Sequence, residues 1–153
     1  MAVAASLVSE RAVMAQIKAS LVKDADNPAR QPISLRAIVN VSAGAENGYA
    51  RGIYQVPAGK RLTIDYIALN NTTPNGETAL SVFVASNASI AYAEVTTSAP
   101  LANLPQFHYS TASQQVHMFA NPGDLVDVGL STNGGSGASF TSVVLNGYLV
   151  DLP

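Results

Sequence analysis

The chain has no cysteine, no tryptophan and no basic residue after Arg61. The lack of cysteine excludes disulfide bonds and thiolate metal sites. Charged residues make up only 12% of the sequence, about half of the ~25% usual for soluble domains. A polar surface with so little charge favours association. We therefore expect much of it either to be covered by other subunits or to face a setting outside the cell or on a particle.

The charges that are present are separated along the sequence. The first 61 residues hold eight basic and four acidic residues, whereas Leu62–Pro153 holds six acidic ones and no basic one. This pattern predicts a dipolar subunit that binds its own copies head to tail. The basic residues are scattered and not clustered with aromatics, so a dedicated nucleic-acid binder is not expected.

The pattern of apolar residues divides the chain into an N-terminal arm, residues 1–32, and a β-sandwich domain, residues 33–153. In the arm, one apolar stripe at helical spacing predicts a helix from Val3 to about Ala15, with residues 16–23 open to helix or strand. The segment Asp24–Pro32 (DADNPARQP) predicts a turn. Glu10 and Arg11 interrupt the apolar start too early for a signal peptide or a membrane span.

From Ile33 on, apolar and polar residues alternate as in a strand with one buried face. Eight further short runs are expected to be strands, with turn-rich segments between them: Gly52–Val56, Arg61–Leu69, Ala79–Ala85, Ile90–Thr96, Gln106–Ser110, Gln114–Phe119, Leu125–Leu130 and Phe140–Val150. Short strands at this spacing predict an all-β protein, an antiparallel β-sandwich that is jelly-roll-like.

Three segments carry a resemblance to known proteins: VPAGKRLTIDYIA (Val56–Ala68), QQVHMFANPGDLVDV (Gln114–Val128) and VVLNGYLVDLP (Val143–Pro153). They resemble a loose group of uncharacterised bacterial β-sandwich proteins. The resemblance implies the fold and an exposed or exported setting. The group has no known activity to transfer, and the Ala-rich arm departs from it.

Side chains suited to catalysis are few. If Gln106–Phe119 were a hairpin centred near Ala112, His108 and His117 would lie opposite each other and could bind a metal. With no carboxylate or thiol nearby in the sequence, two partly exposed strand histidines are the favoured interpretation. Asp124 and Asp127 flank the NPGD turn and could bind calcium, but a turn role fits better. No nucleophile motif is present, so no enzyme, cofactor, metal or catalytic residue is assigned.

The sequence therefore favours a non-enzymatic structural subunit that self-assembles into a filament, shell or surface layer. Its expected setting is extracellular, at the cell surface or on a virion. In this hypothesis the arm packs on a neighbouring β-sandwich through seven residues: Val3, Leu7, Arg11, Met14, Ile17, Lys18 and Leu21. The alternative is a lectin-like module that binds glycans. Its candidate contacts are the tyrosines, whose other expected role is packing: Tyr49, Tyr54, Tyr66, Tyr92, Tyr109 and Tyr148.

Overall fold

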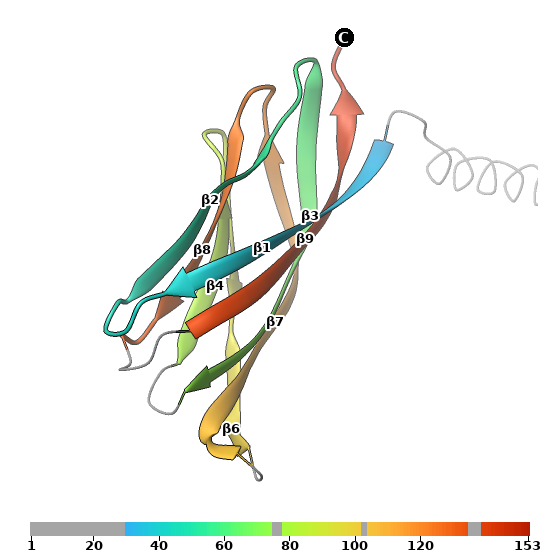
Figure 1. Ribbon diagram of the computed structural model, residues 1–153. Helices are drawn as coiled ribbons and strands as arrows, with labels where there is room; N and C mark the ends of the chain where they lie inside the picture. Colours follow the sequence, from blue (N-terminus) through green and yellow to red (C-terminus); the bar gives the residue numbers. More distant parts are fainter. Residues whose placement is uncertain (1–29, 75–77, 102–103, 135–138) are drawn as a thin grey trace, which may run out of the picture. The chain divides into compact units, whose positions relative to one another are not determined.

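The computed structural model describes residues 30–74, 78–101, 104–134 and 139–153. These residues form nine strands: β1 (Arg30–Val41), β2 (Asn47–Gln55), β3 (Lys60–Pro74), β4 (Ala79–Ala85), β5 (Ile90–Glu94), β6 (Thr96–Leu101), β7 (Leu104–Ala120), β8 (Leu125–Thr132) and β9 (Ser139–Asp151). They build a five-stranded sheet, in the order β1-β9-β3-β7-β6, and a four-stranded sheet, in the order β2-β8-β4-β5 (Figure 1). None of the described residues forms a helix long and apolar enough to cross a membrane.

The order of the strands is that of a jelly roll. With β6 set aside, one sheet takes the first, eighth, third and sixth strands of the chain, and the other takes the second, seventh, fourth and fifth. Two Greek keys folded over each other produce this interleaved order. The prediction of an all-β, jelly-roll-like antiparallel sandwich is confirmed, and β6 extends it beside β7.

The core lies between the sheets and follows the period-two pattern of the sequence. In β1, Ala37, Val39 and Val41 point inward and are buried, whereas the residues between them are exposed. The largest fully buried side chains come from strands of both sheets: Leu62, Ile64, Ile67, Met118, Leu130 and Leu145. Burying each such side chain contributes roughly 1.5–3 kcal/mol, so the strands supply a continuous apolar core of their own.

A β-bulge interrupts the five-stranded sheet near its centre. Asp65 of β3 faces two residues of β7, Val116 and His117, while in β9 the partners of Ile64 and Tyr66 are adjacent in sequence. At this point β9 passes so close to β3 that a Cβ atom on Gly147 would overlap the carbonyl oxygen of Thr63. Gly147 therefore lets the two backbones approach at the bulge.

The hairpin expected near Ala112 is wrong, because β7 is one strand of 17 residues. Ala112 pairs with Leu69 in the middle of the β3–β7 ladder. The segment Ser110–Gln114 contains none of the strongest turn formers, Gly, Pro, Asn and Asp, and its two serines favour turns only weakly. The chain therefore continues straight on.

Several other boundaries differ from expectation. β2 begins at Asn47 rather than Gly52, and β3 continues to Pro74 rather than ending at Leu69. β6 occupies Thr96–Leu101, part of which was expected to be a connection because of its prolines. β1 begins at Arg30 and includes Pro32, which was expected in a turn. β1 lies at the edge of its sheet, where a residue without an N–H group is tolerated.

The expected separation of charge is wrong for the folded subunit, because the jelly roll places early strands beside late ones. β9 lies between β1 and β3, and β8 lies beside β2. Lys60 thus forms an ion pair with Asp151 at 2.6 Å. From residue 30 to the end, five basic residues stand against seven acidic ones, and residues 1–29 hold three of each. The sandwich is therefore only weakly acidic.

Candidate functional site

The outer face of the four-stranded sheet carries a row of three aromatic side chains. Tyr49 of β2 and Phe83 of β4 both pair with Gly129 of β8, and Phe83 also pairs with Tyr92 of β5. The ring centroids are 5.9 Å apart for Tyr49 and Phe83 and 5.8 Å apart for Phe83 and Tyr92. These distances lie in the range of favourable aromatic pairs, so the row crosses the whole sheet.

Gly129 makes the row continuous. A Cβ atom at this position would overlap the ring of Phe83. Because glycine has no side chain, the ring of Phe83 lies across β8 and reaches Tyr49 with an interplanar angle of 70°. A larger residue in β8 would separate the two rings.

This face also exposes aliphatic side chains. Ile90 and Leu125 occupy outward positions of β5 and β8, and their exposed fractions are 50% and 51%, beside 49% for Tyr49 and 57% for Tyr92. We call Tyr49, Phe83, Ile90, Tyr92 and Leu125 together the aromatic face. Clustered exposed apolar side chains of this kind mark interaction surfaces more often than single ones do.

Three charged residues border the aromatic face. Glu94 of β5 lies on one side of the aromatic row, in register with Ser81. Arg51 of β2 and Asp127 of β8 lie on the other side. The Arg51 guanidinium carbon is 5.3 Å from the centre of the Tyr49 ring, which is a cation–π distance. Asp127 accepts a hydrogen bond from the N–H of Gly52 at 2.6 Å, so its carboxylate already has a structural partner.

The outer face of the five-stranded sheet has a different character. Its central rows pair hydroxyl, amide and small apolar side chains: Asn146, Tyr66 and Gln115, then Val144, Ala68 and Ser113, then Ser142, Asn70 and Thr111. No residue in these rows is charged. The low charge of the sequence therefore gives the outer face of the five-stranded sheet a broad neutral polar surface.

A buried polar row lies on the inner face of the same sheet. Asn71 pairs with Ser110 of β7 and lies next to Thr141 of β9. The hydroxyl groups of Ser110 and Thr97 are 3.0 Å apart and share a hydrogen bond. Within the described residues, the side-chain amide of Asn71 and the hydroxyl of Thr141 have no hydrogen-bond partner although both are buried. Unpaired buried polar groups lower stability.

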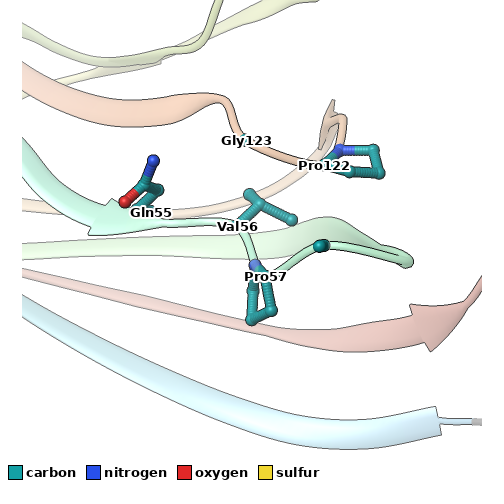
Figure 2. A pocket seen from close by; sticks show the side chains of 6 residues that line it. Gln55, Val56, Pro57, Pro122 and Gly123 are labelled. Carbon is teal, nitrogen blue, oxygen red and sulfur yellow. The ribbon is translucent and has the colours of Figure 1, made fainter.

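A shallow pocket of about 400 Å³ lies at one end of the sandwich. It is formed by the β2–β3 turn and the β7–β8 turn (Figure 2). Two backbone hydrogen bonds join these turns, from Val56 N–H to Asp124 O and from Gly123 N–H to Val56 O. The pocket is lined only by neutral residues, Gln55, Val56, Pro57, Ala58, Pro122 and Gly123. It offers no group for acid–base or nucleophilic chemistry.

His108 and His117 do not lie opposite each other, so the alternative in which they share a metal has no geometric basis. His108 and His117 are nine residues apart along β7, which corresponds to roughly 30 Å in a strand. His108 Nδ1 lies 3.1 Å from the carbonyl oxygen of Ser98. In the part of the chain that the structure describes, no three His, Asp or Glu side chains gather as metal ligands.

Asp124 and Asp127 have the structural roles that their turn position favours. Asp124 Oδ2 accepts a hydrogen bond from the N–H of Asn121 at 2.9 Å and closes the NPGD turn. Asp127 fixes the bulge of β2 through Gly52, whose φ of +59° suits glycine. Both carboxylates therefore stabilise backbone conformations.

The seven residues expected to form an assembly interface lie outside the described residues: Val3, Leu7, Arg11, Met14, Ile17, Lys18 and Leu21. Sequence reasoning noted Tyr49 and Tyr92 as candidate contacts but missed Phe83 and Gly129. Alternation in β4 and β5 indicates which side chains share a face. It does not give the register that aligns them across strands.

No family model matches the chain, and no curated protein matches it. Among solved structures, it is similar to the cryo-EM structure of giant freshwater prawn Macrobrachium rosenbergii extra small virus (XSV) VLP. The identity is 12%, the match covers 76% of this chain and 79% of that chain, and the TM-score is 0.33. Similarity at this level does not bear on function.

Proposed function

We propose that this protein is a non-enzymatic structural subunit that assembles with copies of itself. The observation that carries the proposal is the aromatic face, which stays exposed on a sandwich whose strands already supply a core. Covering apolar surface contributes roughly 25 cal/mol per Å². An exposed face with five large apolar side chains therefore gains free energy when another molecule covers it.

The low charge supports the same proposal. Charged residues make up 12% of the chain, and the central rows of the five-stranded sheet present none. Little charge means little repulsion between identical molecules. Such a subunit suits a filament, a shell or a surface layer in an extracellular, cell-surface or virion setting.

The N-terminal arm supplies a second contact in this proposal. Its apolar residues, among them Leu7, Ile17 and Leu21, would pack on a neighbouring sandwich, with Arg11 and Lys18 orienting the contact. A contact of this kind joins two different surfaces and propagates unless the copies close a ring. The arm would therefore turn single subunits into an extended or closed assembly.

The test uses the full chain in light scattering coupled to size exclusion and in negative-stain microscopy. Wild type should form ordered assemblies at high concentration. A triple variant, Leu7→Ser, Ile17→Ser and Leu21→Ser, should form no large assembly, with unchanged circular dichroism. Ser6→Ala with Ser9→Ala, in the same segment, is the matched control and should behave as wild type. Assembly of the triple variant as in wild type would refute the role of the arm.

Carbohydrate binding is a second candidate, favoured by the row of Tyr49, Phe83 and Tyr92. Exposed rings flanked by Asn47, Ser81 and other polar side chains could stack on sugar rings and hydrogen-bond to their hydroxyl groups. A glycan array probed with wild type and Tyr92→Ala tests it. Saturable binding that the variant loses would support this function over self-assembly through the aromatic face.

A further inference from the structure

We propose that the aromatic face is a symmetric contact, in which two copies of the chain pack the outer faces of their four-stranded sheets against each other. The inference rests on the proposed function and names the partner of this surface, the same face of a second copy. A twofold contact of this kind requires a face that is complementary to itself. The distribution of charge on the aromatic face meets that requirement.

The two edge strands of the face carry one charge of each sign, Arg51 on β2 and Glu94 on β5. Asp127, on the inner strand β8, stays negative while it accepts a hydrogen bond from the N–H of Gly52. Arg51 and Glu94 lie on opposite sides of the aromatic row. A twofold axis through the centre of the row can place Arg51 of each copy beside Glu94 of the partner subunit. Two identical ion pairs then border one apolar centre.

The centre of the face has the composition of an interface core. Tyr and Phe are enriched in such cores and Tyr has few rotatable bonds to order on binding. The rings of Tyr49, Phe83 and Tyr92 hold one another at 5.8–5.9 Å, so little side-chain freedom is left to lose. Charged pairs at the rim exclude water from the rings and fix the orientation of the partner.

The size of the face sets the expected affinity. Four strands spaced about 4.8 Å apart, with about seven residues of about 3.3 Å each, cover roughly 440 Å². Two copies therefore bury roughly 900 Å², below the ~1,200–2,000 Å² of a standard specific interface. The dimer should be weak and depend on concentration. Such a contact becomes effective when the arm contact holds many copies together.

Charge reversal in the full chain tests the pairing directly. Sedimentation velocity at rising concentration should show that Arg51→Glu alone and Glu94→Arg alone each weaken the dimer about tenfold, because both ion pairs become repulsive. The double variant Arg51→Glu with Glu94→Arg should dimerise as wild type. Mixing the two single variants should give mixed dimers, which native mass spectrometry resolves. Arg36→Glu, on the other sheet, is the matched control and should change nothing.

The outcomes separate the two proposals. If the single variants dimerise as wild type, or the double variant is no better than either, the symmetric contact is refuted. Loss of large assemblies in the arm variant, with the dimers of the charge variants unchanged, would refute this inference and leave the proposed function standing. A wild-type chain that never associates refutes both. Glycan binding that Tyr92→Ser abolishes without changing self-association would assign the face to sugars and overturn the inference.

Discussion

Among the glycines that the structure describes, Gly147→Ala should be the most destabilising substitution. A Cβ atom at this position would overlap the carbonyl oxygen of Thr63 and lie 2.9 Å from Ile64 Cα. Both obstacles are backbone atoms in the middle of the five-stranded sheet, so no side-chain rotation relieves them. Overpacking of this kind costs about 1–3 kcal/mol, and we expect about 3 kcal/mol here because the strands themselves must separate at the bulge.

Two other glycines provide graded controls. At Gly59 a Cβ atom would meet nothing within 4 Å, but φ is +73°, so alanine should cost about 1–2 kcal/mol for the left-handed conformation. At Gly129 the obstacle is the far end of the Phe83 side chain, which can rotate away. Gly129→Ala should therefore cost less than Gly147→Ala but should separate Phe83 from Tyr49.

Urea unfolding followed by circular dichroism measures the three free energies of unfolding. Gly147→Ala should show the largest loss, with an unchanged dependence on denaturant. Equal losses for Gly147→Ala and Gly59→Ala would show that β9 does not approach β3 as described. The register of the bulge, and the assignment of faces on either side of it, would then be incorrect.

Other predictions follow from single contacts. Thr141→Val should raise the free energy of unfolding by about 1 kcal/mol, because it removes a buried hydroxyl that has no partner among the described residues; a loss in urea unfolding would show that the hydroxyl is bonded. Lys60→Ala should cost less than about 1 kcal/mol, and less still in high salt, because Asp151 is 59% exposed; thermal melts at two ionic strengths check this. Asp127→Ala should cost about 0.5–1 kcal/mol, because water can replace the lost acceptor at the exposed N–H of Gly52, which chemical denaturation measures. Trypsin acting on the unfolded chain should release Leu62–Pro153 intact, since this region has no basic residue; smaller fragments in mass spectrometry would contradict it.

The strands could be predicted from the sequence where one face is buried and the other is exposed to solvent. In β1, buried Ala37, Val39 and Val41 alternate with exposed residues, and this alternation indicated the strand. Ala79–Ala85 was also expected as a strand and is β4 with the same bounds, although apolar residues lie on both of its faces. The jelly-roll-like class followed from the number and spacing of such runs. The extent of β7 was missed, because the polar residues in its middle break the alternation that marks a strand, and only the pairing with β3 shows that the ladder continues through Ala112.

Properties that depend on pairing between distant strands could not be read from the sequence. The charges look segregated along the chain, yet the fold brings Lys60 to Asp151 across 91 positions. The aromatic row depends in the same way on the register that aligns Tyr49, Gly129 and Phe83. Composition predicted a low-charge surface. Only the topology shows how this surface is divided. The outer face of the five-stranded sheet is neutral and polar, and the outer face of the four-stranded sheet carries the aromatic row.

Sedimentation velocity of the purified full-length chain at low salt, over a wide range of concentration, tests the central claim most directly. The claim predicts that the 15.8 kDa chain sediments increasingly as dimers and larger species as its concentration rises, and that Tyr49→Ser with Tyr92→Ser shifts this rise to higher concentration. A single monomeric species at every concentration, in wild type and variant alike, would contradict it.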